Sequence, residues 1–150
     1  MLMDDKLKLE GQVALVLKDK DGNVKQQKEV NNLIVDAGLN FICDRMKDAT
    51  ESVMSHMGVG SNSTAAAAGN TDLGTLLGSR EALDSTTVTN NQIVFVASFE
   101  AGDGTGTIEE AGIFNAATGG TMLCRVLTGT ITKSASDTLT ITWTITLSAS

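Results

Sequence analysis

The end of the sequence alternates between apolar residues and threonine. Side chains of a strand point alternately to opposite faces, so this pattern predicts a β-strand over residues 138–147. Its threonine face has two interpretations that stay open, a surface in contact with solvent or a contact with another subunit. Its other face is the clearest core assignment in the chain, formed by Leu139, Ile141, Trp143, Ile145 and Leu147.

Similar alternation predicts further strands. Residues 7–17 and 24–30 flank a turn of Asp, Lys, Gly and Asn, which indicates an N-terminal β-hairpin. The turn lacks the spaced glycine and terminal glutamate of a calcium loop. Residues 92–100 are apolar on both faces, which predicts a central strand covered on both sides.

A second hairpin is predicted where two apolar segments flank a glycine-containing loop. The segments are residues 111–115 and 121–127. Residues 60–70 are small and uncharged without periodicity, so we expect a surface loop. The preceding Gly58 and Gly60 do not continue into a phosphate-binding or dinucleotide-binding motif.

One helix is predicted over residues 36–47, with Asp36 as its N-cap and Arg45 and Lys47 in its last turn. Phe41 falls opposite the apolar face, so either a strand covers that side too or Phe41 contacts another subunit. The predicted apolar face has the helical spacing i, i+3, i+4, i+7 and consists of Leu39, Ile42, Cys43 and Met46.

Length and composition favour one globular domain. The 150 residues are 41% hydrophobic and contain no proline, which suits a single β-rich domain over residues 1–150. No apolar run of about 18 residues is present, and the start lacks the basic and apolar regions of a signal peptide. We therefore expect neither a membrane helix nor a secretion signal.

Charge is distributed unevenly along the chain. The net charge is -7, with six lysines and six acidic residues in residues 1–30. Residues 48–150 carry ten acidic residues against Arg80, Arg125 and Lys133. An acidic body repels phosphate backbones, so nucleic acid is not an expected partner. The lysine-bearing start could instead meet an acidic protein surface.

Few residues could carry catalysis or bind a metal. Cys43 and Cys124 have no metal-ligand spacing, and we predict two buried thiols. His56 is the only histidine, and we interpret it as structural or solvent-exposed. Glu109 and Glu110 are adjacent, so they point to opposite faces and are interpreted as a solvated turn edge. The sequence therefore predicts no enzyme, no metal and no cofactor.

Four stretches together resemble a family of small virion proteins of tailed bacteriophages. The similarity covers most of the chain after residue 30, and its most specific piece is GIFNAATGGTMLCRVL followed by the threonine-alternating strand. These motifs resemble those of capsid decoration, or cement, proteins and of some tail or fibre-associated proteins. The four stretches are residues 30–39, 57–61 with the alanine-rich residues after them, 110–125 and 131–145.

The resemblance implies an antiparallel β-sandwich, with a jelly roll as one form, that trimerises on the outer capsid surface and stabilises the shell. The implied partners are its own copies and the major capsid protein, in a virion assembled in the host bacterial cytoplasm, without nucleic acid or membrane. A tail or tail-fibre structural protein is the alternative, and a soluble binding module or enzyme is more distant. Residues 1–10 form either a capsid-facing arm or the first strand, and the candidate arm residues are Leu2, Lys6, Leu7, Lys8 and Leu9.

Overall fold

The fold is built from antiparallel strands and one short helix. The computed structural model describes residues 6–47 and 50–149. The elements are β1 (Leu7–Lys18), β2 (Val24–Asn31), β3 (Leu33–Ile34), α1 (Asp36–Met46), β4 (His56–Gly60), β5 (Glu81–Ala82), β6 (Ser85–Thr89), β7 (Gln92–Phe99), β8 (Gly106–Phe114), β9 (Met122–Lys133) and β10 (Thr138–Ala149).

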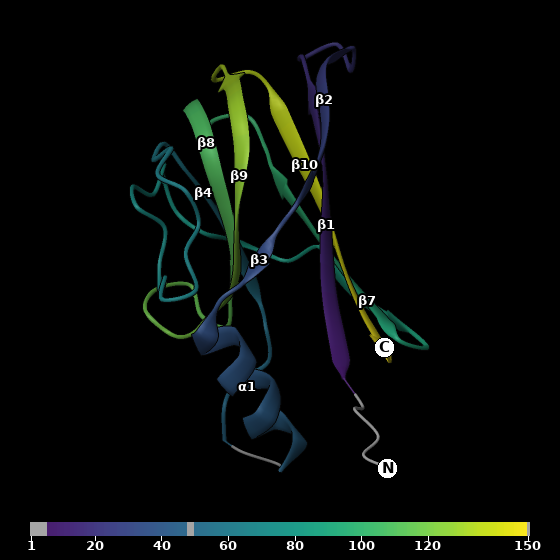
Figure 1. The fold of residues 1–150 in the computed structure, drawn as a ribbon. Helices are drawn as coiled ribbons and strands as arrows, with labels where there is room; N and C mark the ends of the chain where they lie inside the picture. Colours follow the sequence, from purple (N-terminus) through teal and green to yellow (C-terminus); the bar gives the residue numbers. More distant parts are fainter. Residues whose placement is uncertain (1–5, 48–49, 150) are drawn as a thin grey trace, which may run out of the picture.

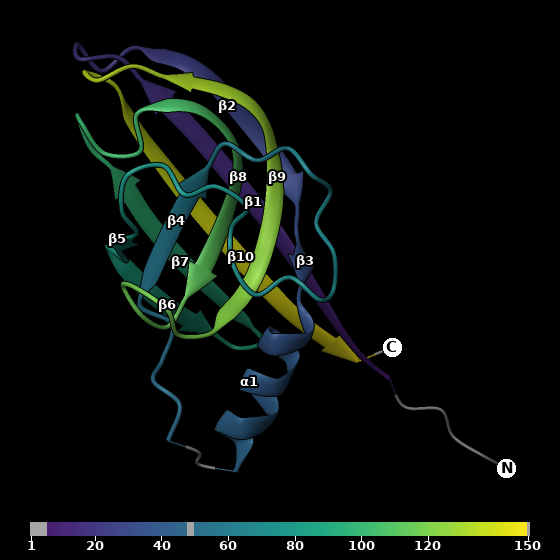
Figure 2. The ribbon, with the colours of Figure 1, turned by 90° about the vertical axis from the view of Figure 1, so that its left-hand side faces the viewer.

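Two five-stranded sheets face each other. Sheet A has the order β2-β1-β10-β7-β6, and sheet B has the order β3-β9-β8-β4-β5. All paired strands run antiparallel, and Figures 1 and 2 show the two layers with α1 below sheet B. The predicted fold class, a mainly β antiparallel sandwich with one short helix, is therefore confirmed.

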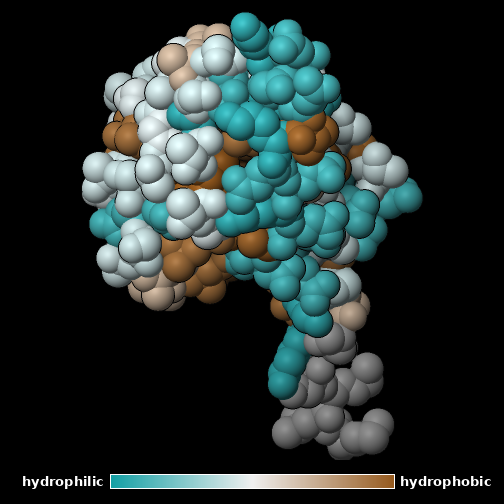
Figure 3. All heavy atoms as spheres, turned by 90° about the horizontal axis from the view of Figure 1, so that it is seen from above, coloured by the Kyte–Doolittle hydropathy of each residue, from teal (hydrophilic) through white to brown (hydrophobic). Residues whose placement is uncertain are grey.

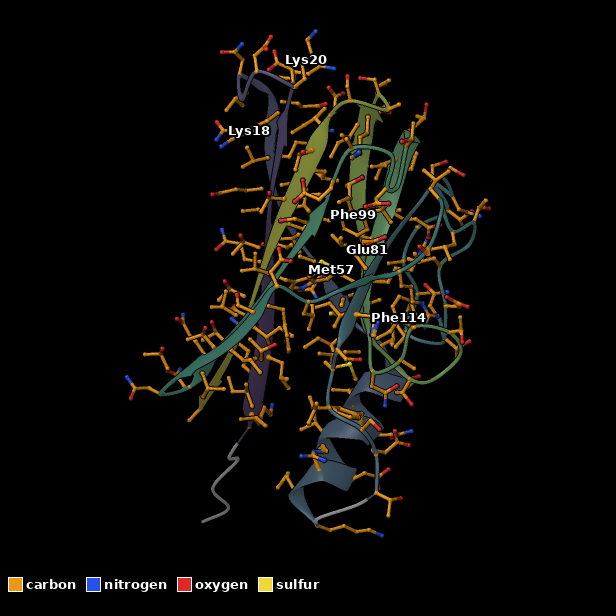
Figure 4. The ribbon with its side chains drawn as sticks, turned by 180° about the vertical axis from the view of Figure 1, so that it is seen from behind. Lys18, Lys20, Met57, Glu81, Phe99 and Phe114 are labelled. Carbon is orange, nitrogen blue, oxygen red and sulfur yellow. The ribbon has the colours of Figure 1, made fainter. Side chains whose placement is uncertain are left out.

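The strand with threonine alternation lies in the middle of sheet A. β10 pairs along its length with β1 and over eight residues with β7. Trp143 and its apolar neighbours at positions 139, 141 and 145 are buried in the main core, and Leu147 packs against that core while partly exposed. Figure 4 shows Phe99 of sheet A and Met57 of sheet B between the two layers. The apolar face of β10 thus forms the centre of the inner surface of sheet A.

Both predicted hairpins are present, but one predicted strand differs in its burial. β1 and β2 form the N-terminal hairpin, and β8 and β9 form the later one. β7 lies inside sheet A, yet Val94 and Val96 on its outer face are only half-buried. The prediction that both faces of this strand are covered is therefore wrong. Figure 1 shows no other described segment over the outer side of sheet A.

The helix is present, but its buried face was predicted wrongly. Gly38 and Phe41 are its buried residues, whereas Leu39, Cys43 and Met46 are exposed. A Cβ on Gly38 would overlap the carbonyl oxygen of Leu123, so this glycine lets the helix approach β9 closely. That approach turns the large ring of Phe41 into the main core, where an aromatic side chain buries most area.

Two further predictions about this region are wrong. Val35 is the residue at the N-cap position, and Asp36 already belongs to the first turn of α1. Cys43 is exposed, so only Cys124 is a buried thiol. Of the predicted apolar face, Ile42 is half-buried and packs against the main core, whereas Leu39, Cys43 and Met46 are exposed. The end of α1 extends below the strands of sheet B (Figure 1).

Candidate interaction surfaces

The outer face of sheet B is covered by the chain itself. A long loop, residues 61–80, lies over this face and forms a second, smaller core on Phe114. Figure 4 shows Phe114 on the loop side of sheet B, away from Met57 and Phe99. This second core is lined by Val35, Leu73, Phe114 and Met122.

Glycines in sheet B make room for the loop. A Cβ on Gly60 would overlap the carbonyl oxygen of Thr75 and the carboxylate of Glu110. A Cβ on Gly58 would lie 3.1 Å from Leu73, and one on Gly112 would lie 3.2 Å from the same side chain. Close approach of two backbones requires glycine at such positions.

A buried ion pair fastens the loop to the sheet. Arg125 donates through Nε to Oε2 of Glu110 at 2.8 Å, and its Nη2 lies 2.8 Å from the same oxygen. Both side chains are almost completely buried. Glu110 also accepts backbone N–H groups from Gly74 at 3.0 Å and Thr75 at 2.9 Å. Arg125 in turn donates to the Thr64 carbonyl at 3.0 Å. We call this Glu110–Arg125 pair and its loop contacts the latch.

The prediction that Glu110 lies at a solvated turn edge is wrong. The sequence placed this carboxylate on a solvated turn edge, but it is fully buried in β8. Its burial is possible because Arg125, which lies opposite Gly112 on the neighbouring strand β9, reaches its carboxylate, and because backbone N–H groups of the loop donate to both oxygens. Glu110 and Arg125 are 15 positions apart, and nothing in the linear sequence indicates that they pair.

A second arginine holds the same loop at its other end. The Arg80 guanidinium lies 3.5 Å from the centre of the Phe114 ring, a cation–π contact. It donates to the carbonyls of Ala116 at 2.9 Å and Gly119 at 2.7 Å, and it pairs with Asp72 at 3.1 Å. Loop 61–80 is therefore fixed at both ends to the β8–β9 hairpin.

The outer face of sheet A is bare by comparison. We call it the threonine face, after the five threonines of β10 at positions 138, 140, 142, 144 and 146. Thr140 and Thr142 at the centre have small or apolar neighbours across the strands, with Thr142 between Ala14 and Val96. Toward the ends of the row, Thr138 pairs with Lys18 and Thr146 with Glu10. All five threonines are half-buried by neighbouring side chains on the same face. The centre of this face is therefore charge-poor.

An apolar groove opens at the end of the sandwich beside α1. It has a volume of about 450 Å³, and Arg45 is the charged residue among the described residues that line it. We call it the α1 groove. Its walls come from both sheets and the helix: Leu9, Phe41, Ile42, Arg45, Val53, Met54, Thr86, Ile93, Phe95, Leu123, Ile145 and Leu147.

The candidate arm residues lie next to this groove. Leu7, Lys8 and Leu9 begin β1 and pair with the end of β10, as expected for a first strand. Lys6 is exposed immediately before β1, and Leu2 lies outside the described residues. Lys8 pairs at 2.6 Å with Glu10 of the same strand. The capsid-facing role of this segment stays a prediction.

The opposite end of the molecule is hydrophilic. Lys18 and Lys20 lie at the β1–β2 turn, far from α1 (Figure 4). Seen from above, the side of this hairpin is strongly hydrophilic, whereas the loop-covered side is paler (Figure 3). Asp19 accepts backbone N–H groups from Asp21 and Asn23, both at 2.9 Å, and the Asn23 bond contributes most to lowering its carboxyl pKa. These bonds close the turn.

One polar cluster connects the two sheets. Lys25 of β2 pairs at 2.7 Å with Asp137, which follows β9 and also accepts from Ser134. The hydrogen bond from Lys25, followed by those from Ser134, lowers the pKa of Asp137 to about 2. Lys133 is buried and donates to the Glu100 carbonyl at 2.9 Å, and burial lowers its pKa. Burial also raises the pKa of Cys124 well above its usual range.

These groups do not converge on a chemical centre. The described residues contain no group of three His, Cys, Asp or Glu side chains that could hold a metal ion. The Nδ1 atom of His56, the first residue of β4, lies 2.8 Å from the Ser55 hydroxyl. Within residues 6–47 and 50–149, no helix is long and apolar enough to cross a membrane.

Comparisons with known protein families, with curated proteins and with solved structures found no match. Interpretation of the surfaces therefore depends on their own physical chemistry. Five residues from the sequence stretches 57–61 and 110–125 lie in or under the latch: Gly58, Gly60, Glu110, Gly112 and Arg125. These residues hold the loop on sheet B, which is a role in folding.

Proposed function

We propose that this chain is a structural protein of a tailed-bacteriophage virion, specifically a capsid decoration protein. In this role it binds the outer capsid surface as a homotrimer and stabilises the shell. The observation that carries the proposal is a sandwich in which the loop covers the outer face of sheet B, while two other surfaces are not covered by the described residues. Those surfaces are the threonine face and the α1 groove.

Adhesion needs broad, pre-formed surfaces more than reactive groups. A decoration protein strengthens a shell by bridging several subunits, and linked copies multiply modest individual affinities. The rigid sandwich supports such a role because the latch and the core fix its outline. The acidic body agrees with a protein partner, since nucleic acid would be repelled.

The copy number in purified virions tests the proposal. Symmetric decoration of a shell predicts on the order of hundreds of copies per particle, measured by quantitative gel analysis or mass spectrometry against the major capsid protein. About a dozen copies or fewer would reject decoration and support the alternative, a tail or tail-fibre protein. Light scattering of the recombinant chain tests the trimer, and a monomer at all concentrations would count against it.

A further inference from the structure

In the part of the chain that the structure describes, the two sheets end in four edge strands. The edges are β2 and β6 in sheet A and β3 and β5 in sheet B. Short length and charged side chains are devices that keep an edge strand from pairing with another chain. β3 and β5 contain two residues each, and β2 carries Lys25, Lys28 and Glu29. β6 has neither device, because it has five residues, Ser-Thr-Thr-Val-Thr, and no charge.

The β6 edge is exposed and regular. All five of its residues are exposed, and Val88 is 68% exposed. β6 pairs with β7 in a continuous register, without the irregularity found between β1 and β2. Figure 1 shows this hairpin projecting from the rim of sheet A, on the side away from sheet B. The outer backbone N–H and carbonyl groups of β6 therefore form a template for a further strand.

The β6–β7 turn holds β6 in place before any partner binds. Thr89 pairs with Gln92 across a two-residue turn, in which Asn90 has a φ of 53°, a left-handed conformation that asparagine tolerates. Asn91 donates through Nδ2 to the Leu147 carbonyl at 2.8 Å, which fastens the turn to β10. A pre-formed strand loses less conformational entropy on pairing than a mobile segment does.

The side chains of β6 divide between two surfaces. Thr86 lines the α1 groove, and Val88 lies two residues further along the strand, so it points to the same side. Ser85, Thr87 and Thr89 therefore point to the side of the threonine face. A strand added to β6 extends both surfaces, and its inward side chains lie at the margin of the groove.

We propose that β6 pairs with β6 of a second copy, antiparallel and centred on Thr87. In this register Thr87 faces its own equivalent, Thr86 faces Val88, and Ser85 faces Thr89. All of these pairs are uncharged, and threonine pairs and β-branched pairs stabilise antiparallel sheets. The two five-stranded sheets A then form one continuous sheet of ten strands.

A second copy suits this edge better than the same chain does. Within residues 6–47 and 50–149, every strand already has a place in one of the two sheets, so an added strand comes from another molecule. Antiparallel pairing about a twofold axis presents the same residues to each other, so an identical strand is self-complementary here.

Charge favours the same contact. The net charge of -7 opposes association of two copies, and this opposition is weakest at an edge strand that carries no charge. Asp84, the residue immediately before β6, faces Asn90 of the second copy in the proposed register and not another carboxylate. The register therefore sets no like charges opposite each other.

The inference goes beyond the proposed decoration role, because it adds a twofold contact to the contacts that form a trimer. Two five-residue strands bury less area than a standard protein interface, so the contact is weak in solution. It becomes effective where many copies are held close together on one surface.

Charge substitution at Thr87 tests the pairing. In the proposed register two Thr87→Lys chains set like charges opposite each other, as do two Thr87→Glu chains, whereas a mixture of these variants sets opposite charges together. Gln27→Lys is the matched control, because Gln27 is exposed on β2, the other edge of sheet A. Sedimentation velocity at low ionic strength measures the dissociation constant of each protein and of the mixture. Near-UV circular dichroism of Trp143 verifies folding.

We expect Thr87→Lys and Thr87→Glu each to raise the dissociation constant at least about tenfold, and their mixture to restore it to within about threefold of the wild-type value. Gln27→Lys should leave it unchanged. The comparison holds whether the associating unit is one chain or a trimer. The proposal is overturned if the wild type does not associate up to millimolar concentration, if the single variants associate like the wild type, or if the mixture stays as weak as each variant alone.

A second measurement does not depend on charge. Thr87→Cys in a Cys43→Ser background removes the exposed native thiol and sets two cysteines opposite each other across the twofold axis. We expect mild oxidation to link these chains into dimers at least about tenfold faster than chains with Gln27→Cys in the same background, because directly opposed residues of paired strands lie within disulfide reach. Equal rates would overturn the proposed register.

The result is separable from the virion copy number. Hundreds of copies per particle combined with association that is insensitive to Thr87→Lys would retain decoration and reject the β6 contact. Recovery in the mixture combined with a low copy number would retain the β6 contact and reject decoration.

Discussion

The outer faces of the two sheets differ in whether the chain itself covers them. On sheet B, loop 61–80 covers the strands and two arginines fasten it there. On sheet A, a row of threonines faces outward and no described segment lies over it (Figures 1 and 2). One face is closed by the chain, whereas the other is available to solvent or to another protein.

The difference lies in how each face satisfies its polar groups. Glu110 and Arg125 lie in the interior of sheet B and need each other, together with loop backbone, to compensate for lost hydration. Threonine hydroxyls remain in reach of water and need no partner from the chain. A polar residue on a strand therefore does not by itself indicate an open surface. The charged pair Glu110–Arg125 lies on the outer face of sheet B, which the loop covers.

The largest expected effect comes from breaking the latch. Arg125→Ala leaves the Glu110 carboxylate buried without its counter-ion, and we expect a loss of about 3–5 kcal/mol in the free energy of unfolding. Urea unfolding followed by tryptophan fluorescence of Trp143 measures the loss.

An exposed ion pair supplies the control for this change. Lys8 and Glu10 are 59% and 61% exposed, so Lys8→Ala should cost less than about 1 kcal/mol. If Arg125→Ala were no more costly than Lys8→Ala, the loop would not depend on the buried pair.

A glycine under the loop gives the next largest effect. Gly60→Ala places a Cβ against Thr75 and Glu110, so the loop must lift, at a cost of about 1–3 kcal/mol. Limited proteolysis should then cut within loop 61–80 faster than in the wild type.

Gly69 lies in the same loop and is the matched control. A Cβ at this position would meet no atom within 4 Å, so Gly69→Ala should leave both stability and proteolysis nearly unchanged. Equal effects of Gly60→Ala and Gly69→Ala would show that the close approach of the loop to β4 does not contribute to stability.

The sequence predicted the strands better than the helix face. Alternation of period two over 138–147 located β10 because one side of that strand is buried from Leu139 to Ile145. The helical pattern failed at α1 because Gly38 and Phe41 are its buried residues, and of the predicted face Ile42 alone packs against the core while the last turn extends past the sandwich. A glycine at close approach contributes nothing to a hydrophobic pattern, so Gly38 gave no warning.

The covered face of sheet B could not be predicted from spacing. Glu110 and Arg125 are 15 positions apart, and they meet only because β8 and β9 pair in a register with two irregularities. The small residues at 60–70 predicted a surface loop, but glycines on β4 let loop 61–80 lie close against the sheet.

A carboxylate that joins the two sheets predicts acid sensitivity. The pKa of Asp137 is lowered from 3.8 to about 2 in the folded protein, so its stabilising effect is present above about pH 4 and is lost as pH falls through about 2. We expect Asp137→Asn to reduce stability near neutral pH and to matter less in acid. Urea unfolding of both proteins at about pH 6, 4 and 3 measures this difference, and a difference independent of pH would contradict the assignment.

The smallest effect on stability is expected on the threonine face. Thr142→Lys changes a half-buried side chain between Ala14 and Val96, and the long lysine can extend into solvent, so the loss should be below about 1 kcal/mol. Its neighbour Ile141 points into the core, and Ile141→Lys should prevent folding. Similar losses in the two variants would contradict the assignment of faces. Once Thr142→Lys is shown to fold, light scattering decides what the face does: an unchanged mass leaves it to solvent, whereas dissociation into single subunits makes it a subunit contact.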